Sequence, residues 1–275
     1  MAGERRTRPA FFGAAGLRDF NYAEMWLTDA RLGAMGVPSA VAFFDAGHAW
    51  GPAEIATAAV EWLELRAVAG GGATRDAAWI RARFDRDRAA VSWLDRAGRA
   101  HDALLRATRL VRTYEGLDRV LGTALDSARA VHARLAGDRE ARRTTERLDR
   151  WLRWEGQRVQ RGQGLWSEPD AFRPSAARAL ARRLGIDELH AQTRDGDTLA
   201  VQAAQRVLAS YLVQASFYLP RHFLASGDTA RAITALELAA AIDEEGQGGC
   251  FWFGGLGRGK EASEGLRGRG RAGGS

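Results

Sequence analysis

Asp19 and His48 have the residue types and the spacing of an acid–base pair. Asp19 follows a short apolar stretch that ends at Gly16, and His48 follows the apolar run Pro38–Phe44. If both stretches are parallel strands joined by one helix, both residues lie at the carboxyl edge of one sheet. A carboxylate there can orient an imidazole through one ring nitrogen, while the other nitrogen acts as a general base. We therefore predict that Asp19 and His48 approach each other.

The elements that must position this pair can be predicted from the apolar pattern of residues 10–68. Residues 10–16 and 38–44 are short apolar runs with Gly or Pro at their flanks, which is typical of buried strands. The segment 21–36 has apolar residues at helical spacing, and a second helix is predicted from Pro52 to about Val68. The order strand, helix, strand, helix indicates a piece of a parallel α/β sheet.

Residues 9–66 resemble the C-terminal end of an α/β-hydrolase of the esterase or dienelactone-hydrolase kind. The resemblance rests on Gly-x-x-Asp ending at Asp19, on Gly-His ending at His48, and on the Trp-Gly-Pro turn that precedes the closing helix. It implies that Asp19 is the acid and His48 the base of a Ser–Asp–His triad that hydrolyses esters or acyl groups. Asp45 is a rival acid, although its place at the strand end favours a role in capping the turn.

The nucleophile of such a triad is missing from the sequence. The nucleophile elbow G-x-S-x-G occurs nowhere in the chain, and the eighteen residues before Asp19 contain neither Ser nor Cys. We therefore expect a C-terminal part of a longer hydrolase, or a degenerate open reading frame, that is not catalytic alone. Because its neighbouring strands would lie upstream, we expect residues 1–70 to be the least stable portion. The helices beyond them should keep their fold when this portion is removed.

Residues 75–245 have helical periodicity almost throughout, interrupted by short turns rich in Gly, Asp and Arg. This pattern predicts an array of antiparallel helices joined by short connections. The expected fold class is thus mainly α, with a tetratricopeptide-like helical array preceded by the short α/β segment 1–70. The helices are predicted at 75–97, 99–114, 116–136, 138–161, 174–184, 186–193, 196–224 and 229–242.

Two stretches of this array resemble tetratricopeptide repeats. In the clearer one, 203–245, Gly227 begins a turn, and Ala232 and Ala239 stand where paired helices approach closely. A weaker copy covers 78–112. Stacked pairs of this kind form a concave surface, so the resemblance implies a protein or peptide partner on the helical part. The open alternative to a hydrolase part is therefore an interaction module without enzymatic activity, whose α/β segment only caps the helices.

The overall composition argues against several other classes of protein. The chain of 275 residues carries a net charge of +6, but its acidic residues alternate with arginines, which is typical of a solvated helical surface rather than of a nucleic-acid interface. The single cysteine, Cys250, excludes an intrachain disulfide. We expect no cofactor and no metal. With no signal peptide and no apolar span in the sequence, we expect no membrane association and a cytoplasmic location. The Gly-rich tail 246–275 is expected to be disordered.

Overall fold

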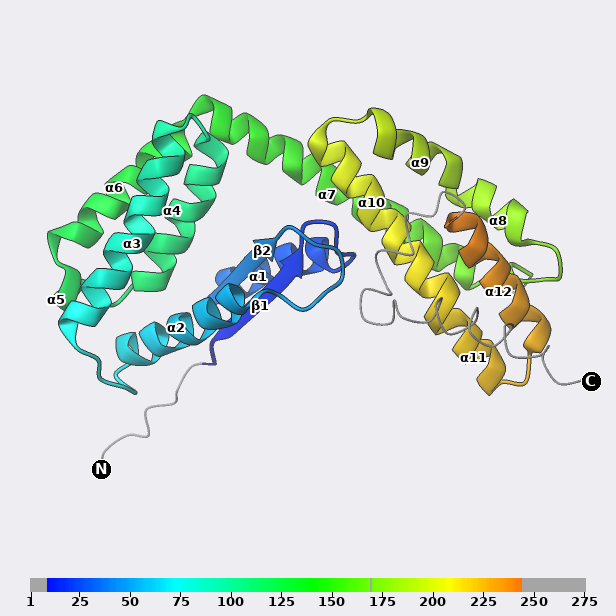
Figure 1. Ribbon diagram of the computed structural model, residues 1–275, viewed down its shortest axis with the longest axis horizontal. Helices are drawn as coiled ribbons and strands as arrows, with labels where there is room; N and C mark the ends of the chain where they lie inside the picture. The colour runs from blue at the N-terminus through cyan, green and yellow to red at the C-terminus, as the bar shows by residue number, and fades with distance from the viewer. Residues whose placement is uncertain (1–8, 169, 244–275) are drawn as a thin grey trace, which may run out of the picture. The chain divides into compact units, whose positions relative to one another are not determined.

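The computed structural model describes residues 9–168 and 170–243, so the expected disorder of 246–275 concerns residues outside this part of the chain. The described chain is mainly helical and contains one two-stranded parallel sheet (Figure 1). It divides into two compact units. The first contains the chain up to Gly156 together with Asp197–Ala203, and the second contains Gln157–Gly196 and the chain from Ala204 onward.

The first unit begins with the predicted alternation of strands and helices. Strand β1 (Phe11–Gly16) leads through helix α1 (Tyr22–Ala34) to strand β2 (Ser39–Phe44), and helix α2 (Ala53–Ala69) follows. The strands pair in parallel, with Phe11 opposite Ser39. Each of the four elements lies within two residues of its predicted bounds, which confirms the α/β character of this segment.

The helices of the array follow, and most of their predicted positions are confirmed to within a few residues. The helix predicted at 116–136 is divided in two at Gly122, which has a φ of 51°, and the one predicted at 196–224 contains a π-helix. In the first unit these are α3 (Ala77–Arg96), α4 (Ala100–Tyr114), the short α5 (Asp118–Leu121), α6 (Thr123–Gly137) and the first part of α7 (Arg139–Trp166). The second unit contains the rest of α7 and the later elements: α8 (Ala177–Leu184), α9 (Ile186–Asp195), most of α10 (Thr198–Val213), a π-helix (Gln214–Tyr218), α11 (Leu219–Ala225) and α12 (Thr229–Ile242).

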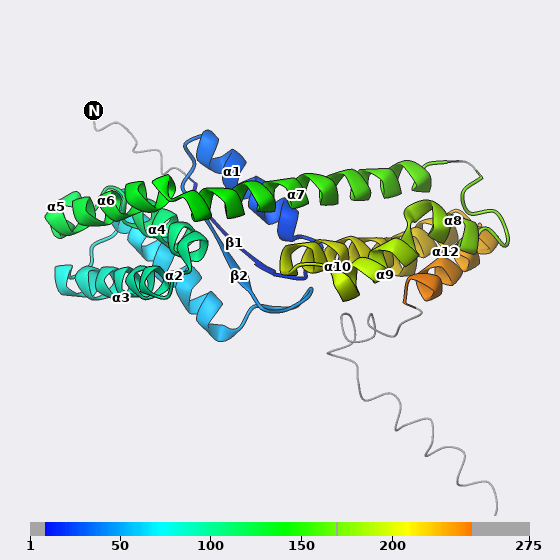
Figure 2. The ribbon, with the colours of Figure 1, turned by 90° about the horizontal axis from the view of Figure 1, so that it is seen from above.

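The two faces of the sheet are covered by different helices, as the alternation of side chains along a strand requires. Figure 2 shows α1 on one side of the strands and α2 on the other. On the α1 side, the ring of Phe43 lies 4.4 Å from that of Tyr22 and 5.6 Å from that of Trp26. On the α2 side, Phe12 lies 5.9 Å from Trp62. The apolar character of both strands is thus explained by burial on both faces.

The outer edge of β2 is closed by helix α4. The carbonyl of Phe44 accepts a hydrogen bond from the amide of Leu17 at 2.8 Å, so even-numbered carbonyls of β2 face β1. Carbonyls alternate along a strand, and that of Val41 therefore faces the outer edge. Arg109 of α4 donates a hydrogen bond to it. A single guanidinium thus satisfies a strand carbonyl that has no neighbouring strand.

A second arginine of α4 joins the same edge to α1. Arg112 forms a bidentate ion pair with Asp29, with distances of 2.8 and 3.2 Å, and also donates to the hydroxyl of Ser39 at 2.8 Å. Ser39 is buried at the start of β2, and its hydroxyl donates to Asp29 at 2.7 Å. These bonds connect the first helix, the second strand and α4, which are far apart in sequence.

Helix α2 shares a hydrophobic core with the helices that follow it. Leu65 of α2 is 2% exposed and packs in one cluster with Phe84 of α3, Leu110 of α4 and Leu125 of α6. This packing argues against the expected independence of the helices from residues 1–70. Removal of α2 would expose the side chains that Leu65 covers, and removal of α1 and β2 would leave Arg109 and Arg112 without their partners.

The second unit contains the helix pair for which the repeat resemblance was clearest. Helices α11 and α12 are joined by a short turn at Gly227, which has a φ of 77° that favours glycine. Asp228 caps α12 by accepting a hydrogen bond from the amide of Arg231 at 3.0 Å. Ala232 and Ala239 are buried on the face of α12 that packs against its neighbours. The pair itself is thus confirmed, while a tetratricopeptide arrangement stays a prediction.

A π-helix separates α10 from α11. The five residues Gln214–Tyr218 form this wider turn, and Pro220 stands in the next turn. Proline has no amide hydrogen to donate, and its ring collides with the carbonyl four residues earlier in an α-helix, here that of Ser216. The wider turn moves that carbonyl away from the ring, so the helical path continues without a break.

We predict that Leu65→Ala lowers the free energy of unfolding of the first unit by about 2–5 kcal/mol, because it leaves a cavity in the shared core. Urea unfolding followed by far-ultraviolet circular dichroism measures this loss. The control Val60→Ala lies on the same helix at a position that is 58% exposed, and it should change stability by less than about 0.5 kcal/mol. An unchanged helical transition in Leu65→Ala would show that α3–α6 fold independently of α2.

Candidate functional site

Asp19 is held in the turn that follows β1. Its carboxylate accepts a hydrogen bond from the amide of Asn21 at 2.9 Å, and its own amide donates to the carbonyl of Gly16 at 3.1 Å. Its carbonyl accepts from the amide of Tyr22 at 2.9 Å, where α1 begins. The residue is only 4% exposed, so its carboxylate is both buried and fixed in direction.

His48 lies against this carboxylate, as the sequence predicts. Its Nδ1 atom is 3.2 Å from each carboxylate oxygen of Asp19. Phe20 stacks on the imidazole, with ring centres 4.6 Å apart and an interplanar angle of 28°. The His48 side chain is 45% exposed, against 6% for that of Asp19. The imidazole of His48 is thus half-exposed. The buried carboxylate of Asp19 orients it through Nδ1, and the ring of Phe20 packs against its face.

The loops after the two strands are in direct contact at Gly16. The amide of Arg18 donates to the carbonyl of Ala46 at 3.0 Å, which ties the first loop to the second. A Cβ atom on Gly16 would lie 2.3 Å from the carbonyl oxygens of Ala46 and Gly47, far inside van der Waals contact. Glycine at this position is therefore what allows the loop that carries His48 to approach Asp19.

Asp45 has a different partner. It forms an ion pair with Arg18, and its side chain is 78% exposed. The pairing of Arg18 with Asp45 adds a second link between the two loops. Asp19, which contacts Nδ1 of His48, is thus the acid that the geometry favours. Sequence reasoning missed the roles of Phe20 and Arg18, although both are neighbours of Asp19 in the chain.

The chemistry available to this pair is that of general acid–base catalysis. A carboxylate on Nδ1 fixes the tautomer in which Nε2 accepts a proton, and it stabilises the imidazolium that forms. Within residues 9–168 and 170–243, no group of three or more His, Cys, Asp or Glu side chains is placed to hold a metal ion. In the same part of the chain, no helix has the length and apolar character needed to cross a membrane.

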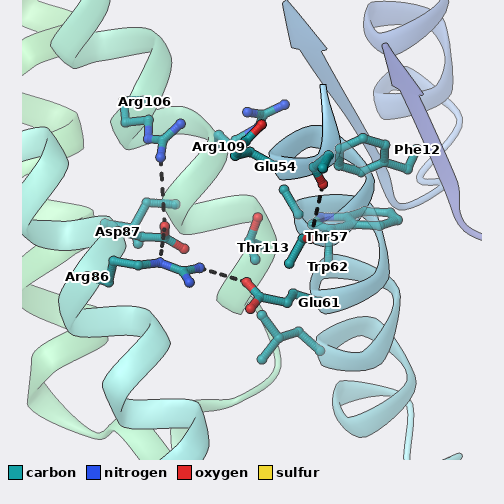
Figure 3. Close-up of a pocket in the computed structure, with 14 residues that line it drawn as sticks. Phe12, Glu54, Thr57, Glu61, Trp62, Arg86, Asp87, Arg106, Arg109 and Thr113 are labelled. Atoms are coloured by element: carbon teal, nitrogen blue, oxygen red, sulfur yellow. Dashed lines mark hydrogen bonds and ion pairs between the residues drawn. The ribbon is translucent and has the colours of Figure 1, made fainter. Parts of the chain in front are cut away.

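A cavity of about 450 Å³ lies between α2 and α4 in the first unit, apart from the Asp19–His48 pair (Figure 3). We call it the α2–α4 cavity. Figure 3 shows that a chain of ion pairs crosses it, from Arg106 through Asp87 and Arg86 to Glu61. Tyr114 donates to Asp87 at 2.9 Å, and burial raises the pKa of this phenol well above its usual range. These groups satisfy one another and indicate a structural role.

We predict that Asp19 fixes the tautomer of His48. With the imidazole neutral, long-range ¹H–¹⁵N NMR should show a protonated Nδ1 and an unprotonated Nε2, because the carboxylate accepts from Nδ1. Asp19→Ala should abolish this preference, and the matched variant Asp45→Ala should retain it. The spectrum of His48→Gln assigns the signals. The same tautomer in the wild type and in Asp19→Ala would contradict the role given to Asp19.

We also predict that Gly16→Ala separates the two loops. The added methyl group collides with two backbone carbonyls, which cannot rotate away as a side chain can. The NMR signature of the His48 contact should be lost and the protein should be destabilised. Gly137→Ala is the control, because a Cβ at that position meets nothing within 4 Å. Retention of the contact in Gly16→Ala would show that the loops approach each other by another route.

Comparison with models of protein families, with curated proteins and with solved structures finds no match for this chain. The hydrolase resemblance of residues 9–66 and the repeat resemblance of the helices therefore stay interpretations of the sequence. The case for a function rests on the geometry of Asp19 and His48 and on the surfaces of the helices.

Proposed function

We propose that Asp19 and His48 are the acid–base part of an ester- or acyl-hydrolysing site of the α/β-hydrolase type. The observation that carries this proposal is the 3.2 Å contact between Nδ1 of His48 and both carboxylate oxygens of Asp19. It occurs directly after two adjacent parallel strands, where sheets of this class build their sites. An imidazole that only covered the surface would not need a buried carboxylate beneath it.

In the proposed reaction, one part of the site supplies the acid–base pair and another part supplies the nucleophile. Asp19 orients the imidazole, and Nε2 of His48 takes the proton of a nucleophile and passes it to the leaving group. The sequence has no G-x-S-x-G, so the nucleophile and its oxyanion hole are to be supplied by residues outside this chain. The chain by itself is thus proposed to hold the base ready without completing the reaction.

An interaction module is the second candidate, and one observation in the second unit favours it. Four large apolar side chains are exposed on the π-helix and on helices α11 and α12: Tyr218, Leu224, Ile233 and Leu236. These elements are neighbours in the fold, and exposed apolar patches are common at protein–protein contacts. Such a module would bind a protein or peptide through its helices, with the α/β segment contributing to stability alone.

We predict that the purified chain has no serine-hydrolase activity. Its hydrolysis of p-nitrophenyl acetate should not exceed that of free imidazole at equal concentration, and a fluorophosphonate probe should not label it, because the sequence contains no G-x-S-x-G elbow. Turnover clearly above this level that is lost in His48→Ala would show that the chain carries its own nucleophile.

The proposed role also has a positive test. A chain extended by the coding sequence upstream of Met1 should acquire a G-x-S-x-G serine that the fluorophosphonate labels. Labelling should fall in His48→Ala and Asp19→Ala and should persist in Asp45→Ala. If the upstream sequence encodes no such serine in any frame, the hydrolase proposal fails and the interaction module becomes the better candidate.

A further inference from the structure

A second cavity lies between α4 and the outer edge of β2, next to the α2–α4 cavity. We call it the β2–α4 cavity. Its volume is about 610 Å³, which is within the range of small-molecule sites. Residues of α1, β2, α3 and α4 line it, all within the first unit. Much of the wall is apolar, from the side chains of Trp26, Val41, Phe43, Leu94 and Leu105.

The charged residues that line this cavity are unbalanced. They comprise four arginines and two aspartates: Arg99, Arg106, Arg109, Arg112, Asp29 and Asp102. Arg112 binds Asp29 at 2.8 Å, and Arg99 binds Asp102 at 2.7 Å, so each aspartate already has an arginine. Among the described residues that line the cavity, Arg106 and Arg109 remain, which gives a net charge of +2.

Arg106 and Arg109 stand three residues apart and therefore share one face of α4. Arg109 uses one N–H on the carbonyl of Val41, and Arg106 lies 3.8 Å from Asp87, at the limit of an ion pair. A guanidinium has five N–H donors, so donors remain on both side chains for a ligand. Burial, and then the neighbouring charge of Arg106, lowers the pKa of Arg109 to about 10. Arg109 thus stays charged at neutral pH in surroundings that disfavour its charge.

The α2–α4 cavity provides the comparison, because Arg106 and Arg109 line it too. The α2–α4 cavity is lined by three arginines, because Arg86 joins Arg106 and Arg109. It is also lined by three carboxylates, those of Glu54, Glu61 and Asp87. Arg86 binds Glu61 at 2.8 Å and lies 3.6 Å from Asp87 (Figure 3). An anion entering from that side meets three like charges. The excess of positive charge therefore favours the β2–α4 side.

We propose that the β2–α4 cavity binds an organic anion with an apolar body, of the class of aryl or medium-chain monocarboxylates. The carboxylate binds Arg106 and Arg109 through charge-assisted hydrogen bonds, and the apolar body covers Trp26 and Phe43. This site is separate from the Asp19–His48 pair, and its existence does not depend on the proposed hydrolase function. It also gives a second role to Arg109, whose first role is to close the strand edge.

A matched set of three compounds tests the charge requirement. Calorimetric titration of the full chain with 4-phenylbutyrate should show saturable binding with one site. The neutral 4-phenylbutanamide should bind about tenfold more weakly or worse, because it offers no charge to the arginines. The cationic 4-phenylbutylamine should not bind. Absence of saturable binding of the carboxylate, or equal binding of the amide, would overturn the proposal.

Substitutions then distinguish the two cavities. Arg106→Gln should weaken binding of 4-phenylbutyrate about tenfold or more, whereas Arg119→Gln, on an exposed part of α5, should leave it unchanged. Ala30→Phe fills the mouth of the β2–α4 cavity and should abolish binding. Ala58→Phe fills that of the α2–α4 cavity and should not.

Both alanines are exposed on helices, so neither change removes a core contact, and circular dichroism checks the fold of each variant. Loss of binding in Ala58→Phe together with retention in Ala30→Phe would place the ligand in the α2–α4 cavity and overturn the assignment. Unchanged binding in Arg106→Gln would overturn the role of the arginines.

Discussion

The contact between the outer edge of strand β2 and helix α4 holds the first unit together. Two parallel strands alone are marginal in water, because their faces are apolar and their edges leave backbone groups without partners. Here α1 and α2 cover the faces, while Arg109 and Arg112 bring α4 to the edge. The strand pair therefore depends on a helix that lies more than fifty residues further along the chain. The contact between Asp19 and His48 depends on the same helix, because both residues lie in the loops that follow the two strands.

The sequence was informative where a single segment decides its own structure. Strand and helix positions follow from apolar spacing and from Gly and Pro at their ends, and Gly227 and Asp228 act locally as a turn and a cap. The approach of Asp19 to His48 could also be predicted, because one crossover between parallel strands brings both strand ends to one edge. Local pattern and simple topology are enough for these features.

The sequence did not predict in the same way which helix or strand packs against each face of an element. The alternation of Arg with Asp along the helices indicates a solvated surface. Arg109 and Arg112 are nevertheless partly buried, and they bind groups of strand β2 and helix α1 near the start of the chain. The residue spacing around Arg109 and Arg112 does not distinguish them from Arg119 of α5, which is exposed. For the same reason the expectation that residues 1–70 stand apart did not foresee Leu65 in a shared core. Such pairings depend on how whole elements dock.

The π-helix before α11 has a consequence for how this part of the gene can change. A residue added to an α-helix rotates everything beyond it by about 100°, and the wider turn absorbs such a residue locally. With the present length, Phe223 of α11 points at Phe172, and their ring centres are 5.1 Å apart. Loss of one codon within Gln214–Tyr218 would close the wide turn and leave the direction of Phe223 unchanged, but it would bring Pro220 into collision with the carbonyl four residues before it. A further added residue would instead turn Phe223 away from Phe172. Substitutions are therefore tolerated here more readily than single-residue insertions or deletions.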